Sequence, residues 1–347
     1  MEILLRITNI IHETPDTKTF YIEHIGGKNI LYRPGQFLTF IFREAGHEVR
    51  RSYSLGSTPG VDNSLFITVK RKVNGSISRQ LFDHYKTGNI LTAIEPSGRF
   101  IIDEPPAKRY IFIAAGSGIT PVFSLIKQLL YFQPATTVLL INQCRNEQHI
   151  IYANELNELR QKFADRFSVI QLFSQPSSHL YISQRLNNIW LETIIRQQLT
   201  GHDLHELQCY ICGPMVFMLM AQFTLKLLGL TDEQIHKEQF VISKPSPAPL
   251  LQDTMPKLVT INYRHNVYQL QAAYPTSILD AALKQGIQLP YSCKAGICST
   301  CTAVCLKGKI VMSNNEVLTD KDMAQGMVLT CTGYAETDAE ISFPQST

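Results

Sequence analysis

The stretch Cys293-Lys-Ala-Gly-Ile-Cys298-Ser-Thr-Cys301 carries the most specific signal in this chain, and Leu-Thr-Cys331 completes it further along. Thiolates are the ligands of iron–sulfur clusters, and C-x4-C-x2-C…C is the spacing of a plant-type [2Fe–2S] centre. Three of the thiols share one loop, so folding of that loop brings them together. The sequence therefore predicts that Cys293, Cys298, Cys301 and Cys331 bind a [2Fe–2S] cluster.

Zinc and a disulfide framework are the alternatives for these cysteines. Structural zinc sites usually combine two short C-x2-C pairs, and only Cys298 and Cys301 form such a pair. Disulfide frameworks suit short secreted chains, not a chain of 347 residues. Cys305 completes part of the bacterial C-x2-C-x2-C-x3-C run, but the first cysteine and the final proline of that run are missing. We expect Cys305 to pack as a small apolar residue on a strand at 302–306.

Length and composition indicate an ordinary globular protein of two or three domains. The chain is 44% hydrophobic and 18% charged, and its net charge of +3 gives no reason to expect nucleic acid or a membrane as a partner. No apolar run approaches the length that spans a bilayer. The first residues, Met1-Glu-Ile-Leu-Leu-Arg-Ile, alternate like a strand and not like a signal peptide. Free thiols and a cluster motif favour a reducing compartment, most simply the cytoplasm.

A proline-rich linker at 243–256 separates a front part from a tail at 257–347 that holds the cluster loop. In the tail we expect a hairpin, a helix and two closing strands, which make a small α+β domain. The hairpin strands lie at 258–263 and 267–271, the helix at 277–285, and the last strands at 327–330 and 339–343.

The front part changes character near residue 102. Residues 1–102 read as short strands separated by turns, at 4–10, 18–22, 37–42, 51–55 and 65–70, which favours an antiparallel β-barrel. Residues 103–242 alternate strands with helices, which favours a doubly wound α/β domain with a parallel sheet. Its strands are expected at 110–114, 137–141, 168–173 and 208–211, and its helices at 121–132, 152–163, 191–199 and 216–228.

Two motifs in the barrel together predict a site for a planar ring that carries a diphosphate. Arg51-Ser-Tyr53-Ser54 offers a cation, an aromatic plane and a hydroxyl at the end of a strand. Asn74-Gly75-Ser76-Ile77-Ser78 leads into a helix at 79–84, and the exposed amides of a helix start bind phosphate. Either motif alone would read as a strand end or a helix cap. Their order makes the joint site the better interpretation.

Two turns in the α/β domain predict a dinucleotide site. Ala115-Gly116-Ser117-Gly118-Ile119-Thr120-Pro121 follows a strand and opens a helix, so its glycines let phosphates approach the helix start. Cys212-Gly213-Pro214-Met215 ends another strand of the same sheet, at the edge where open α/β sheets bind ligands. Each turn alone would be weak support.

The order of these motifs and domains, over essentially the whole chain, resembles the ferredoxin–NADP reductase superfamily, in particular the fused oxygenase reductases with a C-terminal plant-type ferredoxin of β-grasp fold. The resemblance implies FAD in the barrel, with Arg51 on the diphosphate, Tyr53 on the isoalloxazine and Ser54 near N5. Gly75, Ser76, Ile77 and Ser78 would hold the diphosphate, and Val69 joins the cofactor-binding set.

The same resemblance assigns the second nucleotide. The dinucleotide turn would use Gly116, Gly118, Thr120 and Pro121, and the nicotinamide would lie beside Cys212, Gly213 and Pro214. The segment His236-Lys-Glu238-Gln-Phe240 matches a Glu-x-Phe motif that lies close to the flavin. Plant-type loops often carry arginine where this chain has Lys294, which can alter the hydrogen bonds to cluster sulfur.

The choice between NADPH and NADH rests on three side chains. NAD-specific sites often place an acid at the end of the second strand, and here that region reads Asn142-Gln-Cys-Arg145-Asn. Arg145, Ser174 and Arg185 could receive a 2′-phosphate, although solvated loop charges are the alternative. We favour NADPH.

Together the modules predict a monomeric NAD(P)H reductase that passes electrons through FAD and the cluster to an acceptor protein, an oxygenase or hydroxylase component. A flavin joins a two-electron hydride donor to a one-electron cluster. The residues expected closest to the chemistry are Ser54, Glu238 and Cys212. The alternatives are a reductase for a hybrid-cluster or haem protein, and a non-catalytic redox-sensing module.

Overall fold

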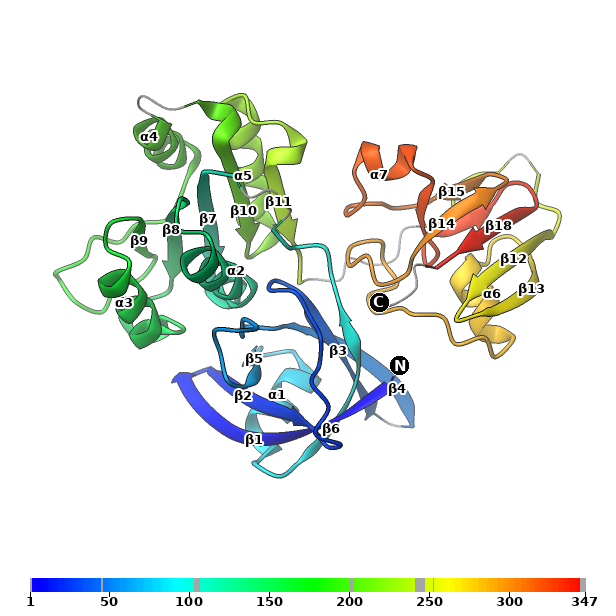
Figure 1. The fold of residues 1–347 in the computed structure, drawn as a ribbon, viewed down its shortest axis with the longest axis horizontal. Coiled ribbons are helices and arrows are strands. Elements are labelled where there is room, and N and C mark those ends of the chain that lie inside the picture. Colours follow the sequence, from blue (N-terminus) through cyan, green and yellow to red (C-terminus); the bar gives the residue numbers. More distant parts are fainter. Residues whose placement is uncertain are drawn as a thin grey trace. The chain divides into compact units, whose positions relative to one another are not determined.

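The computed structural model describes residues 2–44, 46–102, 107–199, 203–240, 247–251 and 253–343. They form two compact units, residues 1–241 and 242–347, and each unit is described by itself (Figure 1). The expected boundary between the first two domains and the first residues of the linker at 243–256 lie outside the described residues. Among the helices that the structure describes, none is long and apolar enough to cross a membrane.

The first part of the larger unit is an antiparallel six-stranded sheet in the order β4-β3-β6-β1-β2-β5 (Figure 1). A bridge between Leu55 and Ile67 joins the end of β4 to β5, and this contact closes the sheet into a barrel. The elements are β1 (Glu2–Thr14), β2 (Thr17–His24), β3 (Phe37–Glu44), β4 (His47–Ser54), β5 (Leu65–Lys70), α1 (Ser76–His84) and β6 (Ile90–Ser97). The predicted antiparallel barrel is confirmed, with Ile77 and Leu81 of α1 buried in its core.

The second part of the larger unit is a parallel sheet in the order β11-β10-β7-β8-β9, flanked by helices on both faces. Its strands are β7 (Arg109–Ala115), β8 (Thr137–Cys144), β9 (Phe167–Phe173), β10 (Leu207–Cys212) and β11 (Ile235–Glu238). Helices α2 (Ile119–Phe132) and α3 (Ala153–Lys162) share one core, and α4 (Asn188–Leu199) and α5 (Met215–Leu227) share the other. The predicted doubly wound domain is confirmed. Its strand order reverses between β7 and β10, where such sheets bind ligands.

The smaller unit has a mixed five-stranded sheet in the order β13-β12-β18-β14-β16, which packs against α6, and a separate two-stranded sheet of β15 and β17. Its elements are β12 (Lys257–Tyr263), β13 (Asn266–Ala272), α6 (Ile278–Lys284), β14 (Thr302–Lys307), β15 (Ile310–Met312), α7 (Asp320–Ala324), β16 (Met327–Leu329), β17 (Gly333–Ala335) and β18 (Ala339–Ser342). The central pair, β12 and β18, is parallel. This is the expected α+β layout, and the cluster loop lies between α6 and β14.

Some elements differ from their predicted bounds. The helix expected at 152–163 begins at Ala153, because Tyr152 has a left-handed backbone (φ 60°) and buries its ring. The helices expected at 79–84 and 121–132 begin earlier, at Ser76 and Ile119. Strands β6, β11, β15 and β17 and the short helix α7 were not predicted. The sequences of β6 and β11, ILTAIEPS and IHKE, lack clean alternation, and β15 and β17 have three residues each, so pairing with neighbouring strands and not local pattern makes them strands.

Candidate functional site

The three residues expected nearest the chemistry meet at one point of the larger unit. Ser54 is the last residue of β4 in the barrel, and its hydroxyl donates a hydrogen bond of 2.9 Å to Oε2 of Glu238. Glu238 ends β11, and the parallel register of β10 and β11 places it beside Cys212. The end of the barrel strand therefore faces the carboxyl ends of two strands of the parallel sheet.

Burial keeps the carboxyl group of Glu238 and the thiol of Cys212 neutral. Desolvation raises the pKa of Glu238 to about 8, although the hydrogen bond from Ser54 opposes the shift. Desolvation also raises the pKa of Cys212, and the neighbouring Glu238 raises it further. At neutral pH the carboxyl group of Glu238 and the thiol of Cys212 both carry their protons, so these residues add little negative charge where a hydride would arrive.

The predicted flavin residues of the barrel differ in how far their side chains are exposed to solvent. Arg51 is exposed on β4, and one guanidinium nitrogen donates to the carbonyl of Arg50 at 2.7 Å. Tyr53 is half-buried with its ring 6.0 Å from that of Phe40, and burial raises its pKa. Val69 is fully buried in the barrel core, so its side chain packs against protein and only its main chain is available to a cofactor.

The start of α1 fits a phosphate group. Gly75 is its N-cap, no described side chain bonds to the cap, and Ser76–Ser78 include no acid. Ile77 is buried and the Ser78 hydroxyl already donates to the Gly75 carbonyl at 3.1 Å, so these residues can offer their amides but not free side chains. A Cβ at Gly75 would lie 2.4 Å from the Ser78 Oγ, a contact that rotation of the serine side chain would relieve.

The two glycines of the dinucleotide turn have different roles. Gly116 has φ +56°, and no described atom lies within 4 Å of a Cβ built on it, which leaves open space for a ligand. At Gly118 a Cβ would lie 2.2 Å from the carbonyl oxygen of Cys212. Gly118 therefore allows close packing of the α2 start against the Cys212-Gly213 turn, and the two predicted dinucleotide motifs touch at the switch point.

Thr120 and Pro121 lie in the first turn of α2, whose N-terminus is not capped by any described side chain. The buried Thr120 hydroxyl has no hydrogen-bond partner among the described residues. It lies close enough to the Tyr152 hydroxyl to lower the pKa of that group. The open space at Gly116 and a helix start without a side-chain cap fit the phosphates of a bound dinucleotide. Pro214, exposed, is the N-cap of α5 at the same edge.

The three residues predicted to choose NADPH gather at the carboxyl ends of β8 and β9. Ser174 directly follows β9, and its N–H donates to the carbonyl of Cys144, the last residue of β8. Arg145 follows Cys144 and donates from Nε to the side chain of Gln175 at 2.9 Å. Arg185 is exposed on a segment that is hydrogen-bonded to the end of β9. The two arginines therefore lie at the same edge of the sheet.

In the smaller unit the four predicted cluster cysteines come together. Contacts with the thiols of Cys298 and Cys331 lower the pKa of Cys293, and the Cys301 thiol contacts that of Cys331. The N–H of Ala295 donates to Cys293 Sγ at 3.3 Å, a contact that stabilises a charged sulfur. The donor set is sulfur alone, and Cys331 contacts both Cys293 and Cys301, which fits a centre held by four thiolates.

Other features of this loop bear on the predictions. Within the described ranges, no group of three or more His, Cys, Asp or Glu side chains could hold a single metal ion. Cys305 lies half-buried on β14 against the core, as expected, and its thiol donates to the carbonyl of Lys307 at 3.3 Å. Lys294 pairs with Asp280 of α6 at 2.8 Å, which ties the cluster loop to that helix.

The sequence reasoning missed the polar residues that join the barrel to the parallel sheet. Lys127 of α2 pairs with Asp62 of the barrel, and the Tyr152 hydroxyl bonds to Thr68 of β5. One signal was present in the sequence: Lys127 lies in the mainly apolar stretch 122–130, where a lysine must find a partner if it is buried. Phe240 lies two residues after Glu238 and is 38% exposed.

Three family models match the chain in the predicted order. An oxidoreductase FAD-binding domain matches residues 4–102, an oxidoreductase NAD-binding domain residues 112–222, and a 2Fe-2S iron-sulfur cluster binding domain residues 266–336. The predicted FAD, nicotinamide nucleotide and [2Fe–2S] cofactors are thereby confirmed.

Curated relatives and solved structures match over nearly the full length. One component of the 1,2-phenylacetyl-CoA epoxidase of Escherichia coli is 33% identical over 94% of this chain and 93% of its own. The ferredoxin reductase component of the 3-ketosteroid-9-alpha-monooxygenase of Mycolicibacterium smegmatis is 30% identical over 98% and 97%. Phthalate dioxygenase reductase shares the fold, with a TM-score of 0.61 at 21% identity over 98% of this chain and 97% of that one. The chain belongs to the family of oxidoreductases that join an FAD domain, an NAD domain and a [2Fe–2S] ferredoxin domain, and it passes electrons from a nicotinamide nucleotide through FAD to the cluster and on to an acceptor protein.

Proposed function

We propose that this chain is the reductase component of an oxygenase system and that it takes its electrons from NADPH. The observation that carries the proposal is the meeting of Ser54, Glu238 and Cys212 where the barrel adjoins the switch point of the parallel sheet. Relatives named as oxygenase reductase components support the class of acceptor.

We assign each predicted residue to one cofactor. When bound, FAD accepts an electron pair from the nicotinamide and releases electrons singly to the cluster. The FAD set is Arg51, Tyr53, Ser54, Val69, Gly75, Ser76, Ile77, Ser78 and Phe240. The nicotinamide-nucleotide set is Gly116, Gly118, Thr120, Pro121, Arg145, Ser174, Arg185, Cys212, Gly213 and Pro214. The cluster set is Cys293, Cys298, Cys301 and Cys331.

Ser54 and Glu238 hold a proton at the edge of the site. Because burial keeps the pKa of Glu238 near 8, the group is a neutral carboxylic acid at pH 7 that both accepts from Ser54 and can donate. We assign it a positioning and protonation role beside the flavin. Neither residue has to act as a nucleophile or as an essential base in this assignment.

The preference for NADPH follows from charge at one edge of the sheet. Arg145 and Arg185 are exposed there, and the segments of both are hydrogen-bonded to the segment that holds Ser174. Arginine is well suited to phosphate because its planar fork can bind two oxygens. We also propose that the chain is a monomer and works in the cytoplasm, where its cysteines stay reduced.

The experiment compares Cys298→Ser with Cys305→Ser after anaerobic reconstitution. Cys298→Ser should lose the visible absorption of the cluster and reduce cytochrome c at least about tenfold more slowly with NADPH, while flavin bleaching and ferricyanide reduction persist. Cys305→Ser should match the wild type in all four measurements. Unchanged cytochrome c reduction in Cys298→Ser would exclude the route through the cluster.

The class of acceptor is tested separately with the NADPH-reduced wild type under anaerobic conditions. Oxygenase components, a hybrid-cluster protein and a haem protein are each mixed with it, and reoxidation is followed. The proposal requires that an oxygenase component reoxidises the chain fastest. Faster transfer to one of the other two proteins would replace it with the corresponding alternative.

A further inference from the structure

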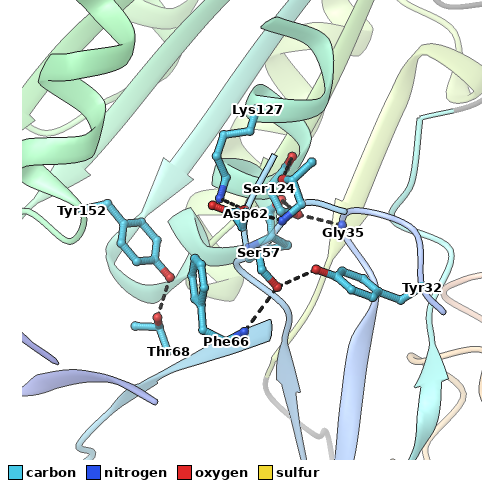
Figure 2. A network of polar contacts seen from close by, with 11 residues as sticks. Tyr32, Gly35, Ser57, Asp62, Phe66, Thr68, Ser124, Lys127 and Tyr152 are labelled. Atoms are coloured by element: carbon cyan, nitrogen blue, oxygen red, sulfur yellow. Dashed lines mark hydrogen bonds and ion pairs between the residues drawn. The ribbon is translucent and has the colours of Figure 1, made fainter. Parts of the chain in front are cut away.

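A polar network joins helix α2 to the barrel (Figure 2). The Nζ of Lys127 is paired with Oδ2 of Asp62, and the same oxygen accepts a hydrogen bond from the N–H of Thr58. One turn earlier on α2, Ser124 accepts from the N–H of Gly35 at 2.8 Å through its hydroxyl, and its carbonyl accepts from Thr58 Oγ1 at 2.8 Å. Two barrel loops are therefore bonded to one face of α2.

The ammonium group of Lys127 is enclosed as well as paired. Its side chain is only 5% exposed, and that of Asp62 is 24% exposed. Nζ lies 4.3 Å from the ring centre of Phe123 on its own helix and 5.0 Å from that of Phe66 in the barrel. The cation thus has an anion and aromatic faces as partners, one of each from the barrel.

A buried ion pair is a poor device for stability but a good one for fixing an arrangement. Desolvation of two charges offsets most of their attraction, so well-packed apolar residues would stabilise the interface as well or better. A charge that leaves its partner, however, stays buried and unpaired at high cost. The pair therefore disfavours any sliding of α2 along the barrel, which apolar contacts alone would tolerate.

The same helix begins at the predicted dinucleotide turn. Thr120 lies in its first turn and Lys127 two turns later, so a rigid helix transmits the position of one to the other. At the helix start, the Tyr152 hydroxyl bonds to Thr68 of the barrel and its ring stacks on Phe123 at 4.4 Å. The helix is thus held to the barrel near both its start and its middle.

We propose, on the basis of the proposed function, that Lys127 is a positioning residue: its pairing with Asp62 fixes the start of α2, and the nucleotide held there, relative to the flavin strands of the barrel. The expectation follows from the sensitivity of transfer reactions to small misplacements, which can cost about a hundredfold when they arise far from the reacting atoms.

The test uses the full chain loaded with FAD, as Lys127→Met and Asp62→Asn. Met keeps the length of the side chain without its charge, and Asn can still accept from Thr58. In hydrogen–deuterium exchange followed by mass spectrometry, both variants should exchange about tenfold faster at residues 57–62 and 116–121. At saturating NADPH, flavin bleaching should slow at least about tenfold, with FAD content and NADP⁺ affinity within about twofold of the wild type.

Arg166→Met is the matched control. Arg166 holds carbonyl groups of the C-terminal end of α2 and the loop after it, including that of Gln133 at 3.2 Å, and its side-chain hydrogen bonds and ring contact all lie within the parallel-sheet domain. Its loss should speed exchange near residues 130–136 but leave residues 57–62 and the bleaching rate unchanged. The double variant of Lys127 and Asp62 should be no slower than Lys127→Met, because the two residues act as one unit.

The outcomes separate the positioning role from the proposed function. If NADPH and NADH both fail to bleach the wild type, the function fails and the positioning role fails with it. If the wild type bleaches and both variants match it in rate and in exchange at 116–121, only the positioning role is overturned. A variant that merely unfolds more easily would show faster exchange throughout the unit with a normal rate per bound flavin, which also overturns the role.

Discussion

Ser54 and Glu238 are 184 positions apart in the sequence, yet the Ser54 hydroxyl donates to Glu238 Oε2 at 2.9 Å. This hydrogen bond joins the last residue of a barrel strand to the last residue of the edge strand of the parallel sheet. It opposes the effect of burial, because it lowers the pKa of a carboxyl group that desolvation raises. The protonation state of Glu238 is therefore a property of the assembled unit.

Flavin reduction by NADPH should depend on pH with a midpoint near 8, the pKa of Glu238. Below that pH the carboxyl group is neutral; above it a buried anion opposes the arrival of hydride, so the rate should fall as pH rises. Ser54→Ala removes a bond that lowers this pKa and should move the midpoint upward. Glu238→Gln should abolish this fall in rate with rising pH. Rapid mixing across pH 6–10 measures the rates of the wild type and both variants. If the rate of Glu238→Gln still fell with a midpoint near 8, another group would be responsible.

Arg145→Ala should raise the apparent KM for NADPH by about tenfold or more and leave that for NADH nearly unchanged. The reason is that an exposed guanidinium at the end of β8 can pair with a 2′-phosphate that NADH lacks. Steady-state rates with both nucleotides give the ratio. Arg196→Ala, an exposed arginine on α4, is the control. Equal effects of Arg145→Ala on the two nucleotides would remove the argument for NADPH.

Gly118→Ala and Gly116→Ala should differ although both glycines belong to one turn. A Cβ at Gly118 would lie 2.2 Å from the Cys212 carbonyl oxygen, so the start of α2 must move away from β10. We expect weaker NADP⁺ binding by at least about tenfold and a loss of stability of a few kcal/mol. Gly116→Ala meets no described atom and should cost only about 1 kcal/mol from its left-handed backbone. Titration with NADP⁺ measures the binding, thermal unfolding measures the stability, and equal losses of stability in the two variants would refute the packing role of Gly118.

Lys294→Met should lower the reduction potential of the cluster by roughly tens of millivolts, since a cation beside the loop favours the more negative reduced state. Asp280→Asn removes the partner of Lys294 and should raise the potential. Redox titration of the visible absorption gives both values. Because both side chains are partly exposed, high salt should shrink the shifts. Shifts of the same sign in the two variants would mean that the loop moves, and the charge argument would fail.

Local chemistry made much of the fold predictable. The alternating strands of the barrel, the strand–helix alternation after residue 110 and the cysteine spacing at 293–301 are short-range patterns, and the structure and family matches agree with them. Several of the failures have a tertiary cause. Strands β6 and β11 exist because neighbouring strands supply their hydrogen bonds, and Tyr152 leaves the helix because its ring is needed at the barrel interface.

The sequence by itself determined which chemistry is present: four thiols at cluster spacing and two nucleotide turns. It could do so because ligand spacing and turn geometry are set by residues close together in the chain. Only the tertiary structure decided that Ser54, Cys212 and Glu238 share one site, that Gly118 serves packing, and that Lys127 finds its anion in the barrel. Those contacts join strands and loops far apart in sequence. Burial arises only when these segments meet, and it sets the protonation of the side chains and the free-energy cost of their charges.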